Sequence, residues 1–151
     1  MPYKKPVSVL VLIHSPDLQI LLLERAAHPG YWQSVTGSQE YGEALIDTAV
    51  REVAEETGIV VAIERIVDWQ QTNTYEIFPE WRHRYAPGVT HNTEHVFSLE
   101  VSRDTPVRIA PGEHRDHCWL PLDEAAAKVF SWSNREAILA LPLRRNGSPL
   151  A

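Results

Sequence analysis

The sequence predicts an α/β fold, in which a mixed β-sheet lies between helices. Two runs rich in leucine and β-branched residues, at 7–13 and 19–25, flank a Ser-Pro-Asp turn and predict a strand hairpin. Helical spacing follows between Glu43 and Gly58. Strand-like and then alanine-rich helical segments return near the C-terminal end. This order of elements favours one sheet with helices on its faces.

The other elements are predicted in chain order from local patterns. Strands are predicted at residues 32–36, 59–67, 68–75, 82–85, 94–101 and 116–120. Two further helices are predicted, one opening at residues 121–124 and one at residues 133–141. The tail, residues 144–151, contains Gly, Pro and Ser and is predicted to fray. We expect a single domain spanning residues 1–151.

Composition limits the kinds of partner. The 151 residues are 44% hydrophobic, which is enough for a proper core, and the net charge of −6 argues against a nucleic-acid surface. Any bound phosphate must therefore be neutralised locally. The single cysteine, Cys118, excludes an internal disulfide and suits a reducing cytoplasm. The N-terminal apolar run is too short for a signal peptide and lacks a cleavage site. We expect a cytoplasmic protein without a membrane partner, and we expect a monomer.

The residues that carry chemistry gather on the first helix. Glu52, Glu55 and Glu56 follow Arg51, and at about 100° per residue they fall within an arc of about 100°. Three like charges so close together repel one another, so a purely structural helix gains little from them. Mg²⁺ removes this difficulty, because it binds a few carboxylate oxygens and keeps water and phosphate oxygens as other ligands. The pattern indicates a magnesium site for a phosphorylated substrate; the alternative is a solvated acidic face.

The surroundings of these glutamates are as specific as the glutamates. Residues 37–59 read GSQEYGEALIDTAVREVAEETGI and fill every fixed position of the pattern G-x5-E-x7-R-E-V-x-E-E-x-G-I. Glu43 suits the start of a helix and Gly58 its end. The segment resembles the box of the Nudix hydrolase family without a departure. The resemblance implies a Nudix α/β/α sandwich and hydrolysis of a diphosphate linked to another moiety, with Mg²⁺ as cofactor and Mn²⁺ as a substitute.

The resemblance also implies roles within the box. Glu52 and Glu56, one helical turn apart, are the first choices as metal ligands. Glu55 is expected to bind a second ion or to orient the nucleophile. Arg51 is expected to fix the catalytic glutamates, together with Glu43, without touching the substrate.

A further acid from outside the box is implied by the same resemblance, because the general base varies within the family. Glu113 is the preferred candidate for a metal ligand, since it lies in a loop just before the strand predicted at 116–120. Glu94 and Glu100 are the alternatives. The competing interpretation makes Glu113 a solvated loop residue.

Several segments outside the box resemble one branch of the family, the bacterial dihydroneopterin triphosphate pyrophosphatases. They are residues 3–8, 32–37, 82–90, 92–94 and 131–135. This resemblance implies hydrolysis of dihydroneopterin triphosphate to the monophosphate and pyrophosphate. Lys4 and Arg25 are expected to offset phosphate charge and Thr36 to donate a hydrogen bond. The other residues expected to bind substrate are Tyr75, Glu76, Ile77, Phe78, Glu113 and Ser131. Trp81 is a further candidate to border the heterocycle, and for each aromatic residue core packing is the competing interpretation.

Three alternative functions remain open at this point. A nucleoside triphosphate pyrophosphatase acting on dATP or a damaged nucleotide would use the same kind of heterocycle and triphosphate. A non-catalytic Nudix domain that senses a nucleotide or binds a partner is disfavoured, because the box glutamates are intact. An RNA 5′-end pyrophosphohydrolase is disfavoured by the acidic balance.

Overall fold

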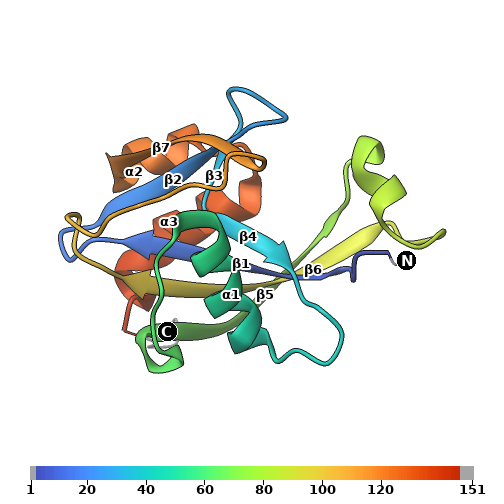
Figure 1. Cartoon of the computed structure of the whole chain (residues 1–151), viewed down its shortest axis with the longest axis horizontal. Coiled ribbons are helices and arrows are strands. Elements are labelled where there is room, and N and C mark those ends of the chain that lie inside the picture. Colours follow the sequence, from blue (N-terminus) through green and yellow to red (C-terminus); the bar gives the residue numbers. More distant parts are fainter. Residues whose placement is uncertain (1–2, 147–151) are drawn as a thin grey trace.

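Among residues 3–146, which the computed structural model describes, seven strands form one mixed sheet (Figure 1). The strands are β1 (Val7–His14), β2 (Gln19–Arg25), β3 (Trp32–Gln33), β4 (Val35–Ser38), β5 (Ile66–Glu76), β6 (His91–Glu100) and β7 (His114–Pro121). The α-helices are α1 (Leu45–Thr57), α2 (Leu122–Lys128) and α3 (Trp132–Arg144). Two 3₁₀ segments, η1 (Ile63–Arg65) and η2 (Pro79–Arg84), flank β5.

Strand β1 is the centre of the sheet and is buried on both faces. It pairs in parallel with β6 along its whole length and antiparallel with β4 through residues 8–11. Val9 and Val11 pack into the core that contains α1, whereas Leu10 and Leu12 pack into the core that contains α2 and α3. Burial of each such side chain contributes about 1.5–3 kcal/mol relative to exposure. Helices therefore cover both faces, and the predicted α/β class is confirmed.

The predicted hairpin and first helix are present with different bounds. β1 and β2 are antiparallel, but the one register pair they share is His14 with Ile20, because β1 pairs with β4 and β6 instead. Helix α1 begins two residues after Glu43. It ends at Thr57, and the next residue, Gly58, has a φ of 75°, the left-handed conformation that suits a glycine after the last turn. Residues 59–67 are not one strand, because η1 precedes β5.

The strand predicted at residues 82–85 is wrong. The segment lies in and directly after η2, which begins at Pro79, where the fixed φ of proline suits the first turn of a helix. Hydrogen bonds of the i to i+3 type, such as that from the Trp81 amide to the Phe78 carbonyl (2.9 Å), then set the backbone. In Figure 1 this segment (yellow-green) projects from the sheet beside the N-terminal end. The amide of Lys4 donates to the carbonyl of Arg84 there (2.9 Å).

The last helix is longer than predicted, and its end is held in place. Arg144, which the sequence placed in a frayed tail, is buried on α3. Its guanidinium donates to Gln71 Oε1 (2.7 Å) and to the Trp69 carbonyl, and it lies 5.1 Å from the centre of the Trp69 ring. These contacts join α3 to β5. Residues 147–151 of the predicted tail lie outside the described residues. None of the helices in the described part of the chain is long and apolar enough to cross a membrane.

Candidate active site

A cavity of about 1010 Å³ lies where β1, β4, β6, α1, η2 and the start of α3 meet. Three of the four expected catalytic residues line it: Arg51, Glu52 and Glu56. All nine residues expected to bind substrate also line it: Lys4, Arg25, Thr36, Tyr75, Glu76, Ile77, Phe78, Glu113 and Ser131. Glu55 lies outside the cavity, about half exposed on α1.

Two carboxylates of α1 are buried beside strand β4. Glu56 is 1% exposed and Glu52 is 8% exposed. The strand backbone approaches closely at Gly37, where an added Cβ would overlap the Glu52 carboxylate. Burial raises the pKa of Glu52, and burial followed by the charge of Glu52 raises the pKa of Glu56 well above its ordinary value. The protein thus holds an acidic pair away from water at a cost in stability.

The donor set of this pair fits a hard divalent cation. Glu56 Oε1 is buried without a hydrogen-bond partner among the described residues, which leaves it available to a ligand. The imidazole of His114 lies 3.8 Å from this oxygen, but burial, followed by the Arg25 charge, lowers the pKa of His114 to about 4. It is therefore neutral at physiological pH. Within residues 3–146 no three His, Cys, Asp or Glu side chains already converge as a finished metal cluster. The fit accordingly rests on the buried carboxylate pair and its unpartnered oxygen.

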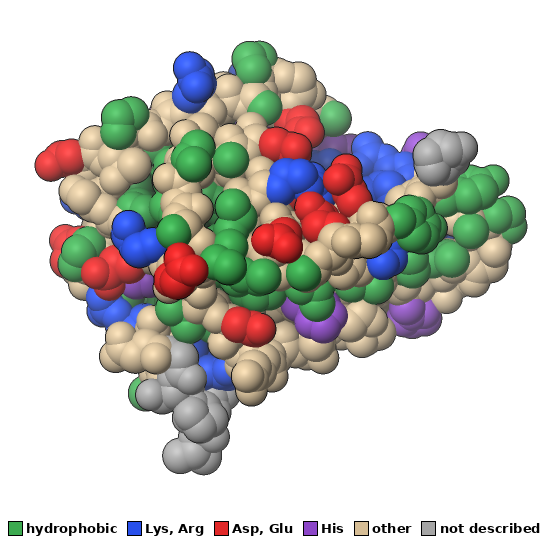
Figure 2. Space-filling view, turned by 60° about the horizontal axis from the view of Figure 1, so that its bottom comes forward, with side chains coloured by type: hydrophobic (Ala, Val, Ile, Leu, Met, Phe, Trp, Pro, Cys, Tyr) green, Lys and Arg blue, Asp and Glu red, His purple; other side chains and the backbone are tan. Residues whose placement is uncertain are grey.

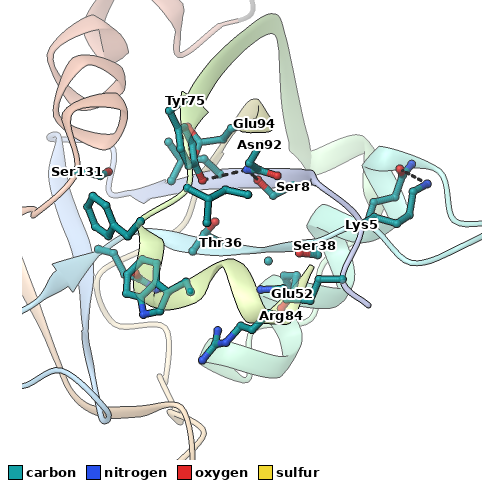
Figure 3. Close-up of a pocket in the computed structure, with 18 of the residues that line it drawn as sticks. Lys5, Ser8, Thr36, Ser38, Glu52, Tyr75, Arg84, Asn92, Glu94 and Ser131 are labelled. Atoms are coloured by element: carbon teal, nitrogen blue, oxygen red, sulfur yellow. Dashed lines mark hydrogen bonds between the residues drawn. The ribbon is translucent and has the colours of Figure 1, made fainter. Parts of the chain in front are cut away.

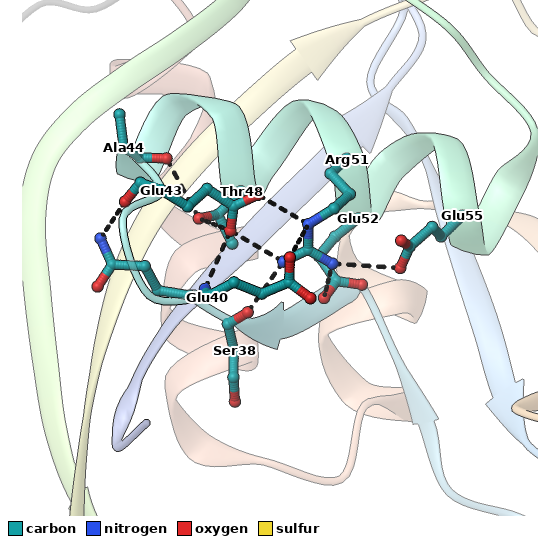
Figure 4. Close-up of polar contacts among 9 residues, drawn as sticks. Ser38, Glu40, Glu43, Ala44, Thr48, Arg51, Glu52 and Glu55 are labelled. Atoms are coloured by element: carbon teal, nitrogen blue, oxygen red, sulfur yellow. Dashed lines mark hydrogen bonds and ion pairs between the residues drawn. The ribbon is translucent and has the colours of Figure 1, made fainter. Parts of the chain in front are cut away.

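Arg51 connects the acidic side chains of the loop and the helix (Figure 4). Its guanidinium donates to both carboxylate oxygens of Glu43 (2.8 and 3.0 Å) and to the Ser38 carbonyl (3.1 Å). Its remaining nitrogen donates to Glu52 (3.1 Å) and Glu55 (3.3 Å). The hydrogen bonds from Arg51 lower the pKa of Glu43 to about 2. The contact with Glu43 is the one that the family resemblance implied.

Cationic side chains line the cavity close to the acidic pair. Desolvation and the charges of Arg84 and Arg25 lower the pKa of Lys4, and desolvation and the charge of Arg84 lower the pKa of Arg25. These three cations therefore repel one another, and the Nε of Arg25 is buried without a partner among the described residues. Figure 2 shows acidic and basic side chains gathered next to each other on one face. A polyphosphate would relieve the repulsion between the cations.

Glu113 lies in the exposed loop before β7, as the sequence predicted. Its negative charge contributes to the raised pKa values of both Glu52 and Glu56, which places it in electrostatic contact with the acidic pair. Thr36 differs from expectation. Its hydroxyl donates to the Val9 carbonyl (2.9 Å), so its proton is already used inside the sheet.

The far side of the cavity adds Ser8 and Asn92, which the sequence did not predict as site residues, to the expected Tyr75 and to Glu94, which was an alternative acid. Asn92 donates from Nδ2 to Ser8 Oγ (2.7 Å) and to the Tyr75 hydroxyl (3.0 Å), and Figure 3 shows this group together with Glu94. The signal was a polar pair, Asn92 and Glu94, at alternating positions that continue into the apolar position Val96 of the same strand.

Aromatic rings border the same cavity. Phe78 and Trp81 have ring centroids 5.0 Å apart, and Trp81 meets Phe130 edge-on at 6.3 Å. The Arg25 guanidinium lies 5.0 Å from the centre of the Trp81 ring. Phe130 follows α2 and was not predicted as a site residue, because only the tertiary fold brings it here.

Known proteins resemble this chain over most of its length. The chain matches the NUDIX domain family over residues 4–141. It is 48% identical over 139 residues to dihydroneopterin triphosphate diphosphatase of Escherichia coli strain K12, covering 90% of this chain and 91% of that protein. It is 39% identical over 142 residues to the Haemophilus influenzae protein of the same name, covering 91% and 88%. The solved structure of the E. coli dihydroneopterin triphosphate pyrophosphohydrolase has a TM-score of 0.87 and 45% identity, covering 95% of this chain and 99% of that one.

The ion pair between Arg51 and Glu43 predicts a pH-dependent stability. The pKa of Glu43 is lower in the folded protein, about 2, than its ordinary value of 4.5 in the unfolded chain. The ion pair therefore stabilises the fold fully above pH 4.5, and this stabilisation is lost as the pH falls toward 2. Because both side chains are partly exposed, we expect Glu43→Gln to lower the free energy of unfolding at pH 7 by about 1–2 kcal/mol. The difference from wild type should shrink between pH 4.5 and pH 2, as measured by urea denaturation without added metal.

Glu40→Gln is the matched control, because Glu40 lies 3.7 Å from Arg51 but its side chain is 70% exposed. It should change the free energy of unfolding by less than about 0.5 kcal/mol. Equal losses in the two variants, or a loss for Glu43→Gln that persists unchanged at pH 2, would contradict this account.

Proposed function

The chain belongs to the Nudix family, and on that premise we propose that it hydrolyses dihydroneopterin triphosphate to dihydroneopterin monophosphate and pyrophosphate. The observation that carries the proposal is one cavity that joins a buried carboxylate pair, three cations and a polar and aromatic far side. The relatives with 48% and 39% identity, which bear the name of this activity, support the same substrate.

The acidic end of the cavity is proposed to hold the cofactor. Nudix hydrolases generally use a divalent metal, and the all-oxygen donor set favours Mg²⁺, with Mn²⁺ as a substitute. Glu52 and Glu56 would bind the first ion. Glu55 and Glu113 would bind a second ion or orient the attacking water. A bound divalent ion would neutralise charge on the phosphate oxygens and lower the pKa of a bound water.

The chain's own residues then bind and orient the triphosphate. Lys4, Arg25 and Arg84 compensate the phosphate charge, because their mutual repulsion is relieved when an anion binds between them. Arg51 holds Glu52 in place while its other nitrogens stay bound to Glu43 and Ser38, so it acts as a positioning residue. Catalysis of this kind depends mainly on positioning and on electrostatic stabilisation.

The substrate is tested by a direct comparison of kcat/KM. Dihydroneopterin triphosphate, dGTP and dATP are each given to the wild-type protein with Mg²⁺, and the products are identified. We expect dihydroneopterin triphosphate to have the highest kcat/KM and to release pyrophosphate. If dATP were turned over with far higher kcat/KM, the proposed function would fail and nucleotide-pool hydrolysis would replace it.

Removing the buried charge of Glu56 should separate catalysis from folding. Glu56→Gln keeps the size of the side chain, and we expect kcat to fall by at least about 100-fold, as when a group that stabilises developing charge is removed. Without metal, Tm should hold or rise, because an unpartnered buried carboxylate is lost. Asp47 is an exposed carboxylate on the same helix, so Asp47→Asn is the control and should keep kcat close to that of wild type. Full activity of the wild type in excess EDTA, or an unstable Glu56→Gln protein that keeps its specific activity, would refute the metal role.

The close contact at Gly37 gives a second, independent test of Glu52. In Gly37→Ala the new Cβ must displace the Glu52 carboxylate, which is the movable end of a flexible side chain. We therefore expect a drop in kcat of about 10-fold or more with a change in Tm of only a few degrees. Gly112 lines the same cavity, and a Cβ added there would have no atom within 4 Å. Gly112→Ala is therefore the control, and it should change neither kcat nor Tm strongly. A stability loss without a loss of kcat would argue against Glu52 as a ligand.

A further inference from the structure

Glu94 is a buried carboxylate that the phosphate chemistry does not use. It lies on β6, is 4% exposed, and lines the cavity. Its Oε1 is buried without a hydrogen-bond partner among the described residues. Burial raises the pKa of this carboxyl, although contacts with Ser133 and Asn73 partly lower it. An acid kept at such a cost needs a partner that supplies hydrogen-bond donors.

Glu94 faces the opposite side of the sheet from the acidic pair of α1. Side chains alternate along β6, so Glu94 shares a face with Val96, which packs in the core of α2 and α3. The next residue after Val96, Phe97, packs in the core of α1 instead. In Figure 3 Glu94 lies beside Tyr75 and Asn92, away from Glu52 and Arg84. Its charge helps to raise the pKa of Tyr75 to about 12, behind burial as the main cause. The place of Glu94 therefore suits the end of the substrate that is remote from the phosphates.

A second acceptor stands next to it. Asn92 lies two residues before Glu94 on the same face of β6 and donates from Nδ2 to Ser8 and Tyr75. Its Oδ1 is buried and, like Glu94 Oε1, has no donor among the described residues. Two unsatisfied acceptors on one wall of a cavity call for a ligand edge with two or more donors.

We propose that Glu94, assisted by Asn92, binds the donor edge of the substrate heterocycle, namely a ring N–H next to an exocyclic amino group. Pterins carry this edge at the 2-amino-4-oxopyrimidine ring, and guanine carries the same arrangement. Adenine does not, since its amino group is flanked by ring nitrogens that accept hydrogen bonds. A carboxylate facing adenine would accept one hydrogen bond from the amino group and would be repelled by the lone pair of the adjacent ring nitrogen. Glu94 is thus a specificity-determining residue. The inference rests on the proposed function for the pterin, but the same edge in dGTP makes it testable separately.

The experiment measures a specificity ratio in the full chain. The value of kcat/KM for dihydroneopterin triphosphate and for dGTP is divided by that for dATP, in wild type and in Glu94→Gln. We expect both ratios to fall by about 10- to 100-fold in the variant, the range for losing a charge-assisted hydrogen bond. Glu100→Gln is the matched control on the same strand, because Glu100 is exposed and pairs with Arg145 (2.8 Å) outside the cavity. It should leave both ratios as in wild type.

A binding measurement removes the dependence on catalysis. Neopterin, which has the heterocycle but no phosphate, is titrated into metal-free protein and followed by its fluorescence. Its Kd should rise by about 10-fold or more in Glu94→Gln. Tm is measured for wild type and for Glu94→Gln. If Glu94→Gln fails to fold, Glu94→Asp replaces it, because aspartate keeps the charge but holds it one methylene further back. It too should lower the ratios.

The outcomes separate the explanations. If Glu94 were a metal ligand or a structural acid, kcat/KM would fall by the same factor for all three substrates and neopterin binding would not change, which would overturn the inference. Unchanged ratios in Glu94→Gln would also overturn it. If dihydroneopterin triphosphate were not a substrate, the proposed function would fail. A collapse of the dGTP to dATP ratio in the variant would still support the role of Glu94.

Discussion

The double burial of strand β1 is the constraint on which the site depends. Because its side chains enter two cores in alternation, α1 must lie on one face and α3 on the other. Its neighbours β4 and β6 are fixed in register by the same strand. Gly37 is thereby held against α1, while Glu94 is held on the side of α3. One strand therefore sets both the acidic end of the cavity and its far end, although their residues are widely separated in the sequence.

The net charge of this protein does not describe the charge at its cavity. The chain carries a net charge of −6, yet five of the described Lys and Arg side chains line the cavity, and three of them, Lys4, Arg25 and Arg84, repel one another. Next to them lie two buried carboxylates: burial raises the pKa of Glu52, and burial together with the charge of Glu52 raises the pKa of Glu56. The cations repel one another, and both carboxylates are held away from water. A polyphosphate would compensate the cations, and a divalent ion would compensate the carboxylates. Such preorganisation favours binding of the complete pair of ligands over binding of either one.

Local patterns predicted the helix of the site well, but they missed the conformation of one neighbouring segment and some of the residues that line the cavity. The helix of Glu52 and Glu56 was readable because its spacing, its end at Gly58 and the box motif all lie within one contiguous segment. The segment at 82–85 was misjudged because hydrogen bonds following Pro79, and not side-chain alternation, set its conformation. Asn92 and Phe130 could not be assigned, since only strand register and helix packing bring them to the cavity. The engaged hydroxyl of Thr36 likewise depends on a contact across two strands.

The hydrogen bond between the Lys4 amide and the Arg84 carbonyl has a practical consequence for handling the protein. It fastens the first described residues beside η2 (Figure 1), and the side chains of Lys4 and Arg84 both line the cavity. An affinity tag fused ahead of Lys4 would emerge beside two of the cations that line the cavity. A flexible, acidic tag would then act as a tethered competitor for the phosphate site, at an effective concentration set by its linker. Apparent KM values from such a fusion would report the tag as well as the enzyme.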